Sequence, residues 1–125
     1  MDIGRFNNNT HFYKGYEPEE EITLKVKECP ELNIHIWDGF FYDIFGNPPM
    51  DGNGWNGFTR DFNQFERTYD SIDVKIDIDE YLADLYSYRS KQFKFTDTYM
   101  CYNLIISFLE YAKSKNMTIL VSWDA

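Results

Sequence analysis

The 125-residue sequence is poor in the residues that most often build catalytic and metal sites. It holds only two histidines and two cysteines. Cys29 and Cys101 are too far apart for a zinc motif, so we expect two free thiols, with a structural disulfide as the alternative. No sequence signature links His11 or His35 to a nucleophilic serine or cysteine. We therefore predict a protein that is not an enzyme, with no catalytic residues, no metal site and no cofactor.

Basic residues are also scarce. Twelve Lys and Arg face twenty-one Asp and Glu, which leaves a formal net charge of −9. Nucleic acids and anionic membranes attract cationic surfaces, so neither is an expected direct partner. A macromolecular partner is expected to be basic. Disorder is excluded as well, because 43% of the residues are hydrophobic and 19% are aromatic.

Long hydrophobic runs are missing. The most apolar stretches, near 34–45 and 99–112, are interrupted by charged and amide side chains and fall short of the roughly 20 apolar residues that cross a bilayer. The chain begins MDIGRFNNN, without the basic start and apolar stretch of a secretory signal. The sequence therefore predicts a cytoplasmic protein.

Alternating apolar and polar residues mark the first part of the predicted domain. Residues 1–21 are Asn-rich and then Glu-rich, which predicts an irregular N-terminal arm, and residues 22–125 are expected to form one domain. Apolar and polar residues alternate over 22–26 and again over 32–36, a pattern typical of two strands paired as a hairpin. The following residues, 37–45, either extend the sheet or turn at Asp38-Gly39.

The rest of the chain alternates between helical and extended patterns. Aromatic residues at steps of three and four predict a helix over 55–69, and alternation predicts strands over 72–78 and 81–88. A long helix is expected from Thr96 or Asp97, either of which could cap it, to Asn116, followed by a strand over 117–123. The order β-β-α-β-β-α-β predicts an α+β fold, with two main helices packed on a mostly antiparallel sheet.

The turn-rich segment DGNGWNG, residues 51–57, resembles two ligand-binding motifs in its letters but lacks the positions or the context that each motif requires. An EF-hand loop needs an oxygen ligand at its fifth position and Glu at its twelfth, where this chain has Trp55 and Phe62. A dinucleotide fingerprint must follow an apolar strand, and none precedes Gly52. We interpret the segment as a turn and helix start.

An acidic cluster is the feature of the sequence that most clearly indicates a function. Six carboxylates accompany a single lysine, Lys75, between residues 70 and 84; they belong to Asp70, Asp73, Asp77, Asp79, Glu80 and Asp84. Side chains two apart on a strand lie about 6.6–7 Å from each other on one face, so the strand would carry a row of anions. Such a row is either a solvated face or a surface for a basic partner.

Three segments resemble a known family. Residues 51–60 (DGNGWNGFTR), 76–80 (IDIDE) and 85–88 (LYSY) resemble immunity proteins of bacterial polymorphic toxin and contact-dependent growth inhibition systems, and immunity protein 51 in particular. The resemblance covers roughly residues 50–123. It implies a small cytosolic protein without catalytic activity, which binds a cognate toxin C-terminal domain and blocks its active site or substrate channel.

Together these observations predict an immunity protein whose acidic surface covers a basic toxin domain, expected to be a nuclease. The residues predicted to bind the partner are Asp73, Asp77, Asp79, Glu80, Asp84, Tyr86 and Tyr88. The tyrosines are included because aromatic residues are enriched among binding hot spots. The alternative function is a small-molecule or carbohydrate-binding module that uses surface aromatics.

Overall fold

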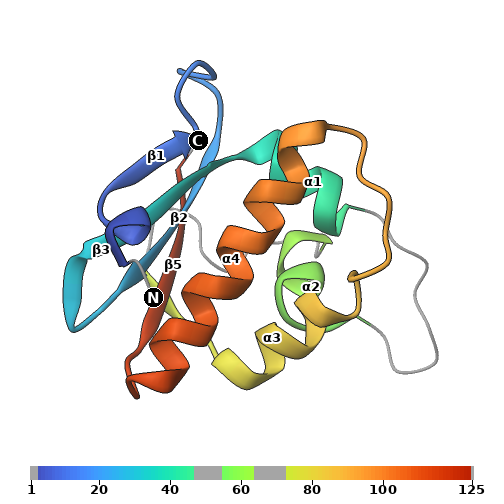
Figure 1. Cartoon of the computed structure of the whole chain (residues 1–125). Coiled ribbons are helices and arrows are strands. Elements are labelled where there is room, and N and C mark those ends of the chain that lie inside the picture. The colour runs from blue at the N-terminus through green and yellow to red at the C-terminus, as the bar shows by residue number, and fades with distance from the viewer. Residues whose placement is uncertain (1–2, 47–54, 64–72, 125) are drawn as a thin grey trace.

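A computed structural model describes residues 3–46, 55–63 and 73–124. These parts of the chain form an α+β fold in which a five-stranded sheet carries four α-helices, as Figure 1 shows. The predicted fold class is confirmed. The elements are η1 (Ile3–Phe6), β1 (Asn9–Phe12), β2 (Glu21–Val26), β3 (Cys29–Trp37), α1 (Asp38–Phe45), α2 (Gly57–Asn63), β4 (Val74–Lys75), α3 (Ile78–Tyr86), α4 (Thr96–Ser114) and β5 (Ile119–Asp124).

The sheet has the strand order β1-β3-β2-β5-β4. The predicted β2–β3 hairpin is present, with Ile22 opposite Ile36, and β5 pairs antiparallel with the other edge of β2. β1 runs parallel to β3, so the sheet is mixed and not purely antiparallel. The antiparallel part carries most of the pairing, as the sequence predicted.

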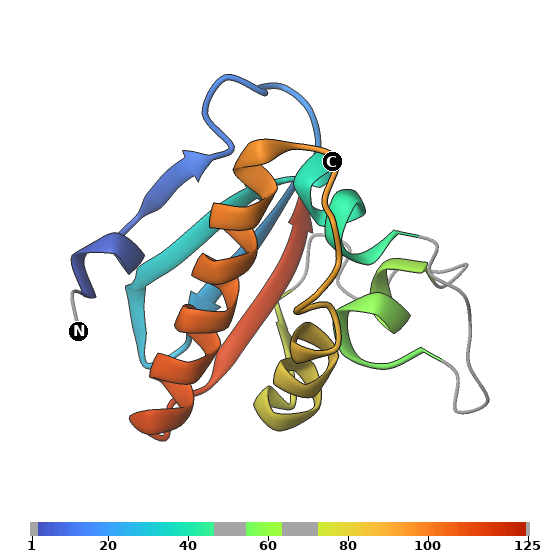
Figure 2. The ribbon, with the colours of Figure 1, turned by 45° about the vertical axis from the view of Figure 1, so that its right-hand side comes forward.

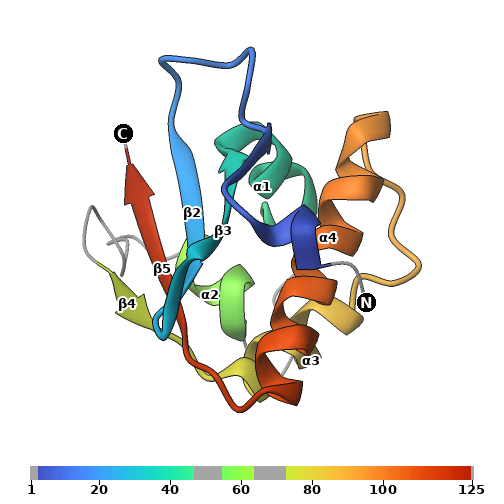
Figure 3. The ribbon, with the colours of Figure 1, turned by 60° about the vertical axis from the view of Figure 1, so that its left-hand side comes forward.

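The α-helices gather on one face of the sheet. α4 lies diagonally across that face in Figure 2, and Figure 3 shows the sheet edge-on with the helices on one side of it. Buried and more exposed residues therefore alternate along the strands, because the apolar side chains point toward the helices. In β2, for example, Ile22, Leu24 and Val26 are fully buried. The core therefore lies between the sheet and α4.

The N-terminal arm is more ordered than the sequence suggested. It contains the 3-10 turn η1 and the four-residue edge strand β1. Phe6 is fully buried, and its ring packs edge-on against Phe108 of α4 with 5.2 Å between centroids. The arm thus contributes to the core, because an aromatic side chain in it covers apolar surface on α4.

Trp37 ends β3, but residues 38–45 form neither an extension of the sheet nor a simple turn. They enter the helix α1 directly after β3, and four of its residues are buried at helical spacing: Phe40, Phe41, Ile44 and Phe45. In the sequence this spacing is obscured because six of the nine residues in 37–45 are apolar or aromatic. A short apolar segment has no clear period, so its neighbours in the fold determine its structure.

The predicted strand over 81–88 is also wrong, because residues 81–86 belong to α3 and the chain turns at 87–88. Leu82 and Leu85, three apart, are both buried, as one face of a helix requires. The strand predicted over 72–78 is reduced to β4, which is two residues long. The first residue of the predicted strand, Ile72, lies outside the described part of the chain. The predicted strand cannot continue to residue 78, because Asp77 is the N-cap residue of α3.

The aromatic helix predicted over 55–69 corresponds to α2. Phe58 is fully buried and Phe62 packs against the core, so this part of the aromatic stripe faces inward as predicted. Phe65 and Tyr69 lie outside the described residues.

The long helix α4 and the final strand β5 are confirmed, but the cap of α4 differs. Its N-cap residue is Phe95, which makes no side-chain cap hydrogen bond. Instead, Asp43 of α1 accepts hydrogen bonds from the backbone N–H groups of Lys94 and Phe95, at 2.8 and 2.9 Å. A carboxylate from another helix therefore anchors the two residues that precede α4 and places a negative charge near the N-terminus of this helix, but it is not an N-cap of the kind expected from Thr96 or Asp97.

Candidate partner-binding surface

Helical backbone separates the seven residues that the sequence placed on one surface. Because α3 follows directly after Asp77, side chains three and four apart share a direction, and those two apart do not. The residues lie in three places: a groove between α3 and α4, the contact between α3 and α2, and the open face of the sheet. The predicted row of carboxylates on one strand is therefore wrong.

Asp77, Asp79 and Tyr86 line the groove between α3 and the C-terminal half of α4. The groove consists of two adjoining depressions of about 550 and 540 Å³, which share Asp79 and Lys113. The Asp77 carboxylate accepts hydrogen bonds from the N–H groups of Asp79 and Glu80, at 3.1 and 3.3 Å, and so caps α3. Asp79 forms an ion pair of 2.7 Å with Lys113 across the groove.

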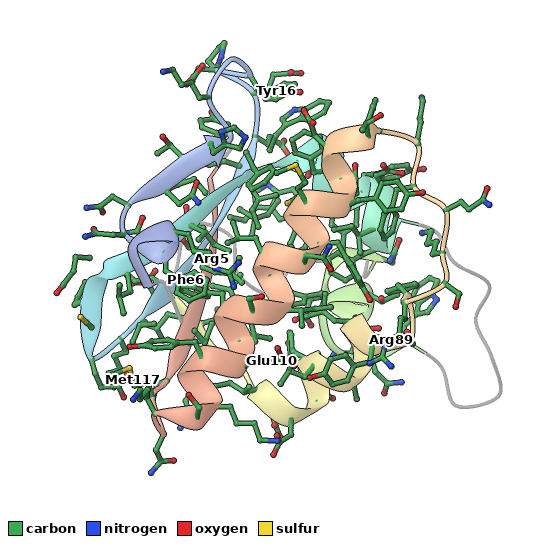
Figure 4. All side chains as sticks on the ribbon, in the orientation of Figure 1. Arg5, Phe6, Tyr16, Arg89, Glu110 and Met117 are labelled. Carbon is green, nitrogen blue, oxygen red and sulfur yellow. The ribbon has the colours of Figure 1, made fainter. Side chains whose placement is uncertain are left out.

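Tyr86 lies at the far end of this groove and is 36% exposed. Its hydroxyl donates a hydrogen bond of 2.6 Å to Glu110 of α4, and this bond raises the pKa of the Tyr86 hydroxyl. The guanidinium carbon of Arg89 lies 5.2 Å from the centroid of the Tyr86 ring. Figure 4 shows Glu110 on α4, with Arg89 beyond the end of α3.

Sequence reasoning missed Glu110 as a member of this groove. It is an isolated exposed acid in the polar stripe of a long helix, which by itself carries no functional signal. Only the packing of α4 beside α3 brings its carboxylate to Tyr86, so no pattern in the sequence could have joined the two.

Asp84 and Tyr88 take part in the contact between α3 and α2. Asp84 is 8% exposed, and its carboxylate accepts hydrogen bonds from the backbone N–H and the hydroxyl of Thr59, at 3.0 and 2.9 Å. The hydroxyls of Thr59 and Tyr88 are 2.5 Å apart. Burial raises the pKa of Asp84 to about 6. The position of Asp84 inside this contact conflicts with its predicted role on an exposed surface.

Glu80 lies on the same side of α3 and pairs with a cation from α2. Its carboxylate is 3.0 Å from the guanidinium of Arg60, which also binds the buried carboxylate of Asp61 at 3.1 Å. Asp61 accepts a further hydrogen bond from the Tyr81 hydroxyl. Burial raises the pKa of Tyr81, and Asp61 adds to that rise. The two helices therefore meet through buried polar groups that are hydrogen-bonded to one another.

Asp73 lies apart from both groups. It forms an ion pair of 2.8 Å with Lys25 of β2, a strand 48 residues earlier in the chain. Both side chains are substantially exposed, at 45% and 31%, so the pair contributes little to stability.

Gly57, the last glycine of the string that matches a nucleotide-binding motif, has a structural role. Its φ is +55°, and a Cβ at this position would lie 2.9 Å from the Cβ of Asp84. Glycine is therefore required where α2 approaches α3, both for the backbone angle and for space.

The remaining candidates for chemistry are satisfied within the fold. His35 is hydrogen-bonded to Thr23, Glu21 and Asn33, at 3.2, 3.1 and 2.9 Å, on the polar face of the sheet. Both cysteines are free thiols, as predicted. Within residues 3–46, 55–63 and 73–124, no three His, Cys, Asp or Glu side chains are grouped so that they could hold a metal ion.

No protein-family model, curated protein or solved structure matches this chain. The comparisons therefore add nothing to what its own residues imply. Among the helices that the structure describes, none combines the length and the apolar character needed to cross a membrane.

Proposed function

We propose that this chain is a bacterial immunity protein that binds and neutralises a cognate toxin domain. The toxin domain is a basic C-terminal domain, a nuclease in the simplest case, and neutralisation takes place in the cytoplasm. The protein acts by covering the toxin's active site and catalyses no reaction itself. This proposal rests on the resemblance of residues 50–123 and on the acidic character of the chain.

The observation that best supports it is the groove between α3 and α4. Three carboxylates border the groove, those of Asp77, Asp79 and Glu110, and the exposed ring of Tyr86 lies beside them. Cationic residues of a toxin can approach these carboxylates from solvent, and a tyrosine at the groove can serve as an aromatic anchor.

The ion pair between Asp79 and Lys113 does not prevent such binding. The two side chains are 73% and 59% exposed, so the pair is weak and readily exchanged. An arginine of the partner can replace Lys113 at Asp79, because its planar guanidinium forms two parallel hydrogen bonds with a carboxylate. Asp77 keeps its capping role in the complex, because a carboxylate can accept several hydrogen bonds at once.

The proposal is tested with the toxin domain encoded next to the gene for this protein. We expect the double variant Asp77→Asn and Asp79→Asn to bind that domain at least about tenfold more weakly at low salt and to protect cells poorly. Asparagine keeps the cap of α3, so the fold is preserved. The control is Glu19→Gln, which removes one exposed acid in the loop before β2. Figure 1 shows this loop at the opposite end of the molecule from α3.

Two measurements separate the function from the site. Failure of the unmodified protein to bind or neutralise the neighbouring toxin domain would refute the proposed function. Equal binding and equal salt dependence of the double variant and the Glu19→Gln control would instead show that the toxin binds another face.

A further inference from the structure

Small side chains leave open the second depression of the groove, where α3 runs beside the C-terminal half of α4 (Figure 1). Its volume is about 540 Å³, and Leu82, Ala83 and Ser114 are among the residues that line it. Ala83 is exposed, and its methyl group occupies little of the space above the buried Leu82. The Ser114 hydroxyl donates a hydrogen bond of 2.7 Å to the carbonyl oxygen of Tyr111 in its own helix. The depression therefore has room for a long side chain of a partner.

The charged groups that line this depression are two carboxylates and one ammonium group, those of Asp79, Glu110 and Lys113. The ammonium group of Lys113 lies 2.7 Å from Oδ1 of Asp79. Glu110 accepts its hydrogen bond from the uncharged Tyr86 hydroxyl, and none of the ion pairs among the described residues includes Glu110. Arg89 is not part of the lining, because its guanidinium lies over the Tyr86 ring. The depression thus already holds one cation, which comes from the chain itself.

Asp79 is free to exchange this cation for another. Its side chain is 73% exposed, and the cap of α3 is made by Asp77, so the fold does not depend on the contact with Lys113. An ammonium group is a point charge, whereas a guanidinium forms two parallel hydrogen bonds with both oxygens of a carboxylate. An arginine of a partner therefore binds Asp79 better than the ammonium group of Lys113 does, and a lysine of a partner would only replace like with like.

Ala83 lies where the stem of such an arginine would pass. It follows Asp79 by four residues on α3, so the two side chains share one face of the helix and are about 5.4 Å apart along its axis. The methylene groups of an arginine bound at Asp79 can lie on Ala83, which removes apolar surface from water on both sides of the contact.

We propose that this depression takes one arginine of the toxin domain and that Lys113 is a built-in competitor for it at Asp79. The inference rests on the proposed toxin binding, and it adds the side chain that the groove selects and the contact that regulates it. Lys113 holds Asp79 in the free protein and moves into solvent in the complex. The ion pair therefore lowers the affinity for the toxin and discriminates against partners that present a lysine at this point.

A double-mutant cycle with the toxin domain encoded next to the gene tests the competition. Lys113→Met keeps the apolar stem and should tighten toxin binding about two- to fivefold, because it releases Asp79 from an exposed ion pair. Lys115→Met, at an exposed lysine just beyond α4, is the control for the loss of one positive charge. In the Asp79→Asn background, Lys113→Met should tighten binding no more than Lys115→Met does, because no carboxylate is left to release.

A second pair of variants tests the space above Ala83 without changing any charge. Ala83→Leu fills the depression and should weaken toxin binding at least about tenfold. Asn103→Leu places the same side chain on the exposed face of α4, outside the lining, and should leave the binding unchanged. Leucine is a good helix former, so both variants keep their helices, which circular dichroism verifies.

Titration calorimetry at one fixed low salt concentration measures all of these affinities. Additive effects of Lys113→Met and Asp79→Asn would overturn the inference, because they would mean that the ion pair is the same in the free and bound protein. Equal affinities of Ala83→Leu and Asn103→Leu would also overturn it. Toxin binding by the unmodified protein would stand in both cases, whereas its absence would remove the proposed function together with this inference.

Discussion

The buried carboxylate of Asp84 makes the stability of this protein depend on pH in an unusual direction. Burial raises its pKa from the ordinary value of 3.8 to about 6. The folded protein therefore binds a proton more tightly than the unfolded chain does. The contribution of this group to stability is fully present below about pH 4 and is lost as the pH rises through about 6.

The size of the effect follows from the shift in pKa. A shift of about two units corresponds to about 3 kcal/mol in the free energy of unfolding. Asparagine has the shape of the neutral acid, and its side-chain oxygen can still accept the backbone N–H of Thr59. The variant Asp84→Asn should therefore gain about 2–3 kcal/mol relative to the unmodified protein between pH 4.5 and pH 7.5, which is about 10 °C in Tm.

Urea unfolding of both proteins across this pH range measures the effect. The difference between the two curves isolates Asp84, because every other titrating group is shared. Asp84→Ala provides a second comparison: it removes the acceptor for the buried Thr59 N–H and should cost about 1–3 kcal/mol near pH 5. A difference between Asp84→Asn and the unmodified protein that does not change with pH would refute the reasoning. It would mean that the hydrogen bonds from Thr59 lower the pKa as much as burial raises it.

Three further substitutions test how the elements are held together. Gly57→Ala should lower the free energy of unfolding by about 2–4 kcal/mol in urea, since it adds a strained φ and a contact with Asp84, and an unchanged stability would contradict the described approach of α2 to α3. Phe6→Ala should cost about 3–5 kcal/mol, and a loss below about 1 kcal/mol would show that the N-terminal arm is dispensable. Asp43→Ala should speed hydrogen exchange of the Lys94 and Phe95 amides and cost about 1–2 kcal/mol; unchanged exchange at both amides would argue against the anchoring of this segment by Asp43.

The sequence correctly predicted the strands and the helix in which apolar residues repeat on one buried face. β2, β3 and β5 alternate because the sheet has helices on one side, and α4 is long enough for its apolar stripe to be unmistakable. The short segments were harder. In 37–45 the density of apolar residues hid the helical period of α1, and in 78–86 the alternation of apolar and polar residues fits a strand as well as a helix.

The site was predicted less well than the fold for a related reason. The positions of acids along the chain were known, but the direction of each depends on whether the backbone is extended or helical. A helix turns Glu80 and Asp84 away from Asp79. An extended backbone would instead have placed Asp73, Asp77 and Asp79 along one face of a strand. The mistaken strand therefore led directly to the mistaken row.

The sequence by itself determined the sign of the charge and the fold class, and it favoured two free thiols over a disulfide. It could not determine which carboxylates are exposed to solvent and which contact another side chain. Asp73, Asp79 and Asp84 contact Lys25, Lys113 and Thr59, all of which are distant in the chain. Only the tertiary structure decides such contacts, because Coulomb and hydrogen-bond energies depend on distance in space and not on separation along the sequence.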